Sequence, residues 1–212
     1  MVYSCLNILP LYYGYLRRSF TSSGLSFQSV QIDPQTLIYF WGPQPGFFTD
    51  KPSLVLINGF VSVSIWQWQH QVPYLAPYFD LYIPDLVFLG QSTTTSLDRT
   101  VEFQAECLIK LLKKIGLRRY HVLGHSYGGF VAYHMARLWP EKVGKVVLVS
   151  SAINRKSRDQ DDLLELTKME NMEDLILPKT PHALRLLMAV TMKRQLPIPV
   201  FILNNFFHVS FF

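Results

Sequence analysis

Uninterrupted apolar runs, each ended by polar or glycine-containing turns, predict buried strands through the middle of the chain. Residues 54–57 (Leu-Val-Leu-Ile) are apolar throughout and stop at an Asn-Gly pair. Residues 81–86, 120–123 and 145–150 have the same character and predict further strands. Because strands of a parallel sheet are covered on both faces, such continuous runs indicate a parallel sheet.

The segments between these predicted strands show the apolar spacing of helices. Residues 98–115 give the clearest pattern, with apolar residues at three- and four-residue spacing. Asp98 is expected to cap the start of this helix, and Gly116 to end it in a left-handed conformation. Residues 127–139 predict a second helix, and residues 66–78 a shorter one bent by a proline. Alternating strands and helices predict an α/β fold with a mostly parallel, doubly wound sheet.

The two ends of the chain differ from this alternating region. Residues 29–40 predict two short strands around an Asp-Pro turn. Beyond Ser151 the pattern predicts short helices and no strand. We therefore predict four segments: an apolar N-terminal segment (1–27), an α/β core (28–153), a helical segment (154–196) and an atypical apolar tail (197–212).

Composition excludes several classes of protein. The 212 residues suit one domain with an insertion, and 49% apolar against 17% charged residues exclude an intrinsically disordered chain. The net charge of +5 comes from basic residues in pairs, without the long stripe that a nucleic-acid-binding protein carries. The two cysteines, Cys5 and Cys107, lack metal-ligand spacing, so we expect no disulfide scaffold, metal or other cofactor.

The N-terminal segment has the character of a surface helix. Residues 1–16 carry no charge and Arg17 and Arg18 follow, whereas a secretory signal places its positive charge first. The stretch is too short to span a bilayer. We expect a helix packed on the domain or lying on a membrane, with peripheral membrane contact through residues 1–18. We favour a cytoplasmic location over an organelle or a membrane surface, although an organellar transit peptide is the alternative reading.

One motif carries chemistry: Gly-His-Ser-Tyr-Gly-Gly at residues 124–129, between a predicted strand and a predicted helix. Gly-x-Ser-x-Gly at such a junction is the nucleophile elbow, in which Ser126 occupies a strained turn. Side chains at Gly124 and Gly128 would clash in this turn, and Gly129 lets the helix approach the sheet. The turn presents the hydroxyl beside main-chain N–H groups that can stabilise an oxyanion. A glycine turn with an idle serine is the alternative.

With these residues the sequence resembles the α/β-hydrolase superfamily over residues 28–195. It is most similar to plant-type members of the esterase, lipase and carbon–carbon-bond hydrolase group (AB hydrolase-1 type). Besides the elbow, the likeness rests on residues 54–60 (LVLINGF), 82–92 (YIPDLVFLGQS) and 145–151. A serine at the elbow argues against the epoxide hydrolase and haloalkane dehalogenase branches, which carry aspartate.

The resemblance assigns roles to particular residues. It implies that Ser126 is the nucleophile and that the backbone N–H groups of Phe60 and Tyr127 form the oxyanion hole. It also implies that residues 154–195 form a helical lid that sets substrate choice. Asn58 stands where the family usually has histidine, which weakens support for the oxyanion hole without abolishing it. For Asp85 the resemblance favours a bracing role over a catalytic one.

The partners of the serine are missing from the expected places. The family places its acid after the seventh strand and its histidine after the eighth. Residues 175–212 contain no Asp or Glu, and His182 and His208 are their only histidines. We therefore predict a truncated hydrolase fold that lacks its last two strands, with strand 145–150 left as an apolar edge that residues 198–203 could cover.

The remaining titratable residues are expected to be structural or solvated: His70, His121, His125, His134, Asp159, Asp161 and Asp162. The predicted function is hydrolysis of an apolar ester-like or other carbonyl substrate, impaired by loss of the acid and the histidine. The alternatives are a catalytically inactive hydrolase-fold protein and a module that binds a small apolar ligand.

Overall fold

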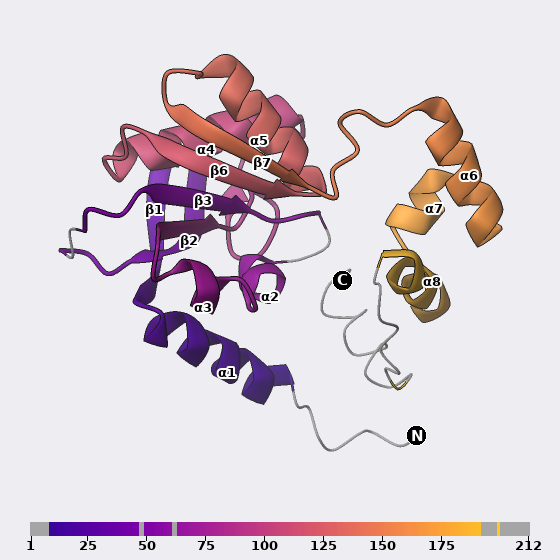
Figure 1. The fold of residues 1–212 in the computed structure, drawn as a ribbon, viewed down its shortest axis with the longest axis horizontal. Coiled ribbons are helices and arrows are strands. Elements are labelled where there is room, and N and C mark those ends of the chain that lie inside the picture. The colour runs from indigo at the N-terminus through magenta and orange to yellow at the C-terminus, as the bar shows by residue number, and fades with distance from the viewer. Residues whose placement is uncertain (1–8, 47–48, 61–62, 192–198, 200–212) are drawn as a thin grey trace. The chain divides into compact units, whose positions relative to one another are not determined.

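The computed structural model describes residues 9–46, 49–60, 63–191 and 199. The chain separates into two compact units (Figure 1). Among the described residues, those up to Ile153 form one unit and those from Asn154 onward form the other. The first unit contains the sheet and the elbow, so it positions the candidate site.

A seven-stranded sheet of mostly parallel strands forms the centre of the first unit, as predicted. Its order is β1-β2-β4-β3-β6-β7, with the short β5 paired to β2. Strands β4, β3, β6 and β7 run parallel, and β1 and β2 form an antiparallel hairpin whose β2 borders β4. The strands are β1 (Leu25–Asp33), β2 (Thr36–Pro43), β3 (Ser53–Ile57), β4 (Asp80–Pro84), β5 (Thr93–Thr94), β6 (Tyr120–His125) and β7 (Val143–Val149).

Five helices accompany the sheet in the described part of this unit: α1 (Leu9–Ser22), α2 (Ser64–Trp68), α3 (Val72–Leu75), α4 (Val101–Lys114) and α5 (Tyr127–Leu138). The predicted helix at 66–78 is two short helices, with Pro73 in the first turn of α3. The predicted cap of α4 was wrong, because the Thr100 side chain accepts the hydrogen bond from Phe103 N. Asp98 instead accepts hydrogen bonds from the amide and hydroxyl of Thr100.

Alternating side chains of β3 divide the core into two layers. Val55 and Ile57 belong to a cluster on the side of α4 and α5, whereas Leu54 and Leu56 belong to a cluster with residues of α1 and α2. The picture agrees, with α4 and α5 on one side of the sheet and α1 to α3 on the other (Figure 1). Full burial of each such side chain contributes about 1.5–3 kcal/mol. The continuous apolar run of this strand follows from its being covered on both faces.

Helix α1 is the predicted N-terminal helix, but it begins at Leu9 and continues through both arginines. Leu16 and Phe20 are buried against the sheet. The Arg17 guanidinium lies over the rings of Phe27 and Trp41, 5.3 and 5.6 Å from their centroids. Of the helices that the structure describes, none combines the length and the apolar character that crossing a bilayer requires.

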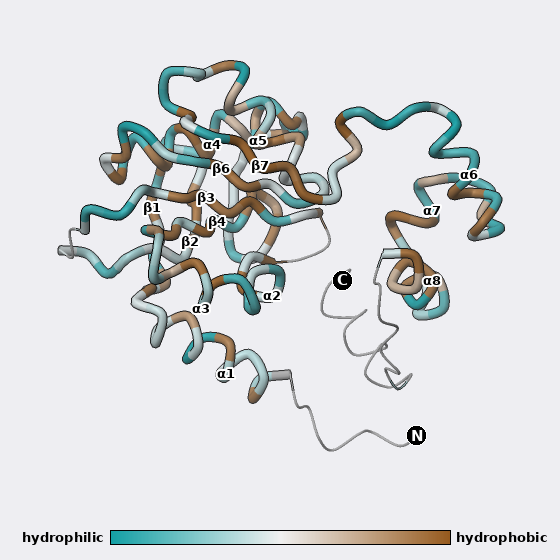
Figure 2. Tube along the Cα trace, in the orientation of Figure 1, coloured by the Kyte–Doolittle hydropathy of each residue, from teal (hydrophilic) through white to brown (hydrophobic). Residues whose placement is uncertain are grey.

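Strand β7 is the last strand of the sheet among the described residues. Val146, Val147, Leu148 and Val149 are each exposed by 38–47%, although they are consecutive and apolar (Figure 2). The structure therefore has the predicted apolar edge at this strand. The segment expected to cover it, residues 198–203, lies outside the described residues except for Pro199.

The described part of the second unit contains short helices, as predicted: α6 (Ser157–Thr167), α7 (Met172–Ile176) and α8 (Pro181–Thr191). The Asn171 side chain caps α7 by accepting a 2.9 Å hydrogen bond from Asp174 N. Leu175 and Leu184 are buried, which gives α7 and α8 a small apolar contact of their own.

Candidate active site at the end of strand β6

Ser126 sits at the junction of β6 and α5 with φ 52° and ψ −119°. A positive φ in a residue with a side chain costs about 1–3 kcal/mol, so the surrounding structure must hold it. Two backbone hydrogen bonds do so. The amide of Ser126 donates to Val149 O at 2.9 Å, and the amide of Gly129 donates to Ser126 O at 3.0 Å. The backbone at this serine thus makes a sharp turn between the strand and the helix.

Each glycine of the motif lies where a side chain would collide with neighbouring atoms. A Cβ on Gly124 would lie 2.2 Å from Gly128 O, and a Cβ on Gly128 would lie 2.4 Å from Ile57 O. A Cβ on Gly129 would lie 2.4 Å from the Ser151 hydroxyl oxygen. The turn therefore requires glycine at all three positions.

The loop after β3 packs directly against the serine. A Cβ on Gly59 would lie 3.2 Å from Ser126 Cβ, so the loop approaches the serine closely at this glycine. The rings of Phe60 and Tyr127 meet edge to face with centroids 5.9 Å apart. Tyr127 is the first residue of α5, and N–H groups in a first helical turn have no acceptor within the helix. The fold thus brings Phe60, Ser126 and Tyr127 to one place.

Asn58 stabilises the loop after β3. Its side chain is fully buried, and Asn58 Nδ2 donates a 3.0 Å hydrogen bond to Gly59 O. The residue that replaces the family's usual histidine therefore holds the peptide that faces Ser126.

Asp85 has the bracing role that the sequence favoured. Its Oδ1 accepts a 3.0 Å hydrogen bond from the amide of Ser64, and its backbone oxygen accepts one of 2.8 Å from the Ser92 hydroxyl. A Cβ on Gly90, which has φ 60°, would lie 2.3 Å from Asp85 Oδ2. Burial raises the pKa of Asp85 above its ordinary value, and hydrogen bonds from Ser64 and Gln91 oppose this shift. The carboxyl group joins the start of α2 to the loop that follows β4.

No base contacts the serine within the described residues, where the Ser126 hydroxyl makes no hydrogen bond to a histidine or a carboxylate. His125 is its sequence neighbour, but the His125 Nδ1 atom lies near Gly59, and burial lowers the pKa of this imidazole. The ring of His125 is half-buried against the loop after β3, and the structure shows no hydrogen bond between it and the Ser126 hydroxyl.

The other described histidines lie elsewhere. His134 Nδ1 is 3.3 Å from Glu102 Oε1, between α5 and α4. His121 lies near the start of β6, and a Cβ on Gly144 would lie 2.8 Å from its ring. His70 is exposed between α2 and α3, and His182 is exposed on α8 of the second unit. His208 lies outside the described residues.

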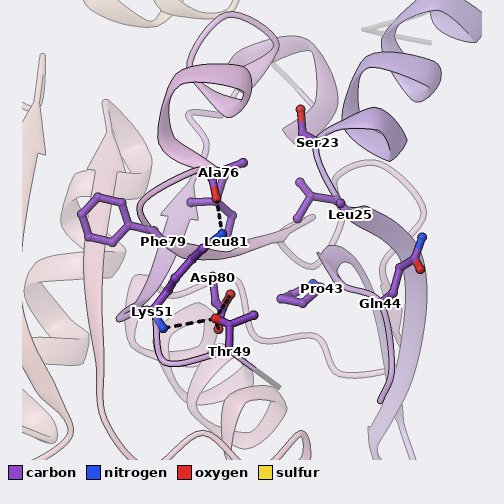
Figure 3. Close-up of a pocket in the computed structure, with 11 residues that line it drawn as sticks. Ser23, Leu25, Pro43, Gln44, Thr49, Lys51, Ala76, Phe79, Asp80 and Leu81 are labelled. Carbon is purple, nitrogen blue, oxygen red and sulfur yellow. Dashed lines mark hydrogen bonds between the residues drawn. The ribbon is translucent and has the colours of Figure 1, made fainter. Parts of the chain in front are cut away.

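A cavity of about 220 Å³ opens at the other end of the sheet (Figure 3). It is lined by Asp80, the first residue of β4, whereas Ser126 follows the last residue of the parallel strand β6. Three polar side chains that line it are already paired, since Lys51 Nζ donates to Ala76 O at 2.9 Å and the Thr49 hydroxyl donates to Asp80 at 2.8 Å. The described residues also contain no cluster of side chains that could hold a metal ion. Neither feature competes with the elbow as the candidate site.

Sequence reasoning missed the contribution of β7 to this site. Val149 O anchors the amide of Ser126, and Ser151 packs over Gly129. A signal was available, because the carboxyl ends of neighbouring parallel strands meet at one edge of a sheet. The residues that follow the predicted strand at 145–150 could therefore have been placed beside Ser126 from the sequence.

Comparisons with known proteins agree with this architecture. A family model described as alpha/beta hydrolase fold matches residues 52–191. An uncharacterized protein of Mycobacterium tuberculosis is 34% identical over 100 residues, which cover 47% of this chain and 29% of that protein. Human monoacylglycerol lipase ABHD6 is 24% identical over 210 residues, which cover 93% of this chain and 59% of the lipase.

A solved structure described as a membrane phospholipase A, a bacterial virulence factor, is also similar. It matches with a TM-score of 0.74 and 26% identity, covering 96% of this chain and 64% of that one. The chain therefore spans less than two thirds of the length of each of these three proteins.

Proposed function

The chain belongs to the alpha/beta hydrolase fold family, and from this premise we propose that Ser126 is the nucleophile of a serine hydrolase. In this proposal the backbone N–H groups of Phe60 and Tyr127 form the oxyanion hole. The activity is cleavage of an ester or a related carbonyl compound of apolar character. The rate is far below that of a complete triad, because the described residues bring no base to the serine.

One observation carries the proposal, namely the positive φ of Ser126 at the end of β6. A glycine in its place would remove the strain, so a turn with no chemical role has no need of serine here. A residue held in an unfavourable backbone conformation by close packing is typical of functional sites. The close approach of Gly59 to Ser126 adds support, because an oxyanion hole needs main-chain N–H groups of this loop beside the serine.

The proposed reaction follows from these groups. Ser126 Oγ attacks the carbonyl carbon of the ester and passes its proton to a solvent water molecule, and the negative charge that forms on the carbonyl oxygen is stabilised by the two N–H groups. Collapse of this intermediate breaks the ester C–O bond and releases an alcohol, whose oxygen takes a proton back from solvent water. Water then hydrolyses the acyl-serine to a carboxylic acid. Without a base, proton transfer limits both steps, and residual catalysis falls orders of magnitude below that of an intact triad.

The substrate class is inferred from the names of similar proteins. The human relative is named a monoacylglycerol lipase, and the structural neighbour is named a phospholipase. Both names denote action on lipids, so we extend to this chain an apolar acyl ester as its substrate. We also assign the helices α6, α7 and α8 to a lid, which in this proposal selects the acyl group.

A second candidate function is binding of a small apolar ligand without turnover. The observation that favours it is the Ser126 hydroxyl, which has no base among the described residues. In this alternative the elbow and the loop after β3 serve only to shape a binding site.

A fluorophosphonate probe, which reacts with nucleophilic serines, distinguishes the two candidates. We expect slow labelling at Ser126 that disappears in Ser126→Ala and persists in Ser29→Ala, a serine on strand β1. Peptide mass spectrometry locates the adduct. A folded protein, judged by circular dichroism, that remains unlabelled would refute the nucleophile and leave ligand binding as the better account.

A further inference from the structure

The outward side of helix α1 is apolar, although its inward side already packs on the sheet. Leu16 and Phe20 are buried, whereas Leu11 and Tyr15 are 75% and 65% exposed. A helix at the surface of a globular protein normally turns charged and polar side chains to water. The outward residues of α1 are therefore more apolar than is usual for a helix face exposed to water.

Exposed tyrosines extend this apolar character to the neighbouring helices. Tyr74 on α3 and Tyr78 just beyond it are 79% and 69% exposed. Helix α1 lies beside α2 and α3 on the same side of the sheet (Figure 1). The ring of Tyr12 packs on Trp66 of α2, with centroids 5.1 Å apart, and the Tyr12 hydroxyl donates a hydrogen bond to Gln69. These contacts fix α1 to the layer that carries the other tyrosines.

The charged side chains of α1 to α3 and the segments beside them are all basic. Residues 9–32 and 63–79 contain no Asp or Glu, and Asp33 is the first acidic residue of the chain. Arg17 is directed over aromatic rings of the sheet, whereas Arg18 is exposed and follows Leu11 and Tyr15 at helical spacing. Leu11, Tyr15 and Arg18 thus form one outward stripe.

We propose that this layer binds the surface of an anionic lipid bilayer, with α1 lying in the plane of the headgroups. The binding surface consists of Leu11, Tyr12, Tyr15, Arg18, Tyr74 and Tyr78, called here the α1–α3 surface. Leucine inserts among the upper acyl carbons, and tyrosine is suited to the interface because its ring is apolar and its hydroxyl is polar. Arginine near the surface pairs with anionic headgroups. The proposal stands independently of the role of Ser126.

Charge complementarity favours a bilayer over a second copy of the chain. A symmetric dimer through this surface would place the same patch on both sides of the contact. Arg18 would then face an identical surface that contains no acidic residue. An anionic bilayer instead offers the negative charge that the surface lacks.

Vesicle flotation of the full chain tests this proposal. We expect binding to vesicles of equal parts phosphatidylcholine and phosphatidylserine, and much weaker binding to phosphatidylcholine alone. Because one basic residue near an anionic surface contributes about a fivefold change in partitioning, Arg18→Gln should weaken binding by about that factor. The double variant Leu11→Ser with Tyr15→Ser should abolish binding.

Matched controls come from exposed apolar residues away from α1–α3. Leu97 lies before α4 and Tyr133 on α5, so Leu97→Ser and Tyr133→Ser remove comparable exposed groups and should bind as the parent does. Circular dichroism checks that every variant is folded. The proposal is overturned if neither vesicle binds the parent chain, if the controls lose binding equally, or if sedimentation velocity shows that the α1–α3 variants abolish self-association and leave lipid binding intact.

Discussion

The amide nitrogen of Ser126 donates a 2.9 Å hydrogen bond to the carbonyl oxygen of Val149, the last residue of strand β7. This bond ties the strained turn after β6 to the strand at the edge of the described sheet. The elbow therefore depends on a strand whose apolar residues are nearly half exposed. Changes in β7 should affect the geometry of the serine as well as the solubility of the protein.

Replacing the strained serine should increase stability while it removes reactivity. Glycine adopts φ 52° without a Cβ penalty, so Ser126→Gly should raise the free energy of unfolding by about 1 kcal/mol. Ser126→Ala retains the penalty and should leave stability nearly unchanged. Urea unfolding followed by fluorescence measures both variants. A Ser126→Gly protein less stable than the parent would show that the hydroxyl itself holds the turn.

The elbow glycines should tolerate no side chain. A Cβ on Gly128 would lie 2.4 Å from Ile57 O, so Gly128→Ala must displace backbone atoms at the end of β3 and should cost about 3 kcal/mol or more. Gly14, within α1, is a matched control because nothing lies within 4 Å of its Cβ position. Gly14→Ala should stabilise the protein by about 0.5–1 kcal/mol. Thermal unfolding compares the two, and equal effects would contradict the packing at the elbow.

Local sequence patterns predicted the parts of the fold that depend on short-range rules. Strand β3 was readable because burial on both faces leaves an uninterrupted apolar run. The turn at Ser126 could be predicted because its steric demands confine glycine to fixed positions around this serine. The predicted cap of α4 was wrong because both Asp98 and Thr100 are good capping residues. The carboxylate of Asp98 accepts its hydrogen bonds from Thr100 and not from the helix.

Other features depend on contacts between residues far apart in the sequence, which local patterns do not reveal. Strand β5 has two residues, too few for a periodic signal, and exists because Thr93 and Thr94 pair with the start of β2. The neighbours of His125 and His134 likewise follow from how the loop after β3 and helix α4 pack. For the same reason the sequence alone could not say which group, if any, contacts the Ser126 hydroxyl.

The buried carboxyl of Asp85 should make stability depend on pH in a defined direction. Its pKa in the folded state lies above the ordinary value of 3.8, so the folded protein holds the proton more tightly than the unfolded chain. This group therefore contributes stability at and below pH 3.8 that is lost as pH rises through the folded-state pKa. Asp85→Asn cannot titrate, so the stability of the parent minus that of the variant should fall with rising pH.

Urea unfolding of both proteins from the acid range to neutral pH measures this difference. Asp98→Asn is a suitable control, because hydrogen bonds from Thr100 lower the pKa of that exposed carboxyl, and its contribution has the opposite sign. A difference for Asp85 that grows with rising pH would show that the hydrogen bonds from Ser64 and Gln91 outweigh burial.

Strand β7 should govern self-association of the chain. Its run of four exposed apolar residues lies at the end of the described sheet, and an exposed apolar edge strand is a template for pairing with another chain. A lysine at such an edge opposes pairing, so Val147→Lys should lower light scattering on storage and shift sedimentation toward the monomer. Leu166→Lys, at an exposed leucine of α6, adds the same charge away from the sheet and should change neither measurement. If both variants reduce association equally, net charge is responsible and the edge of β7 is not.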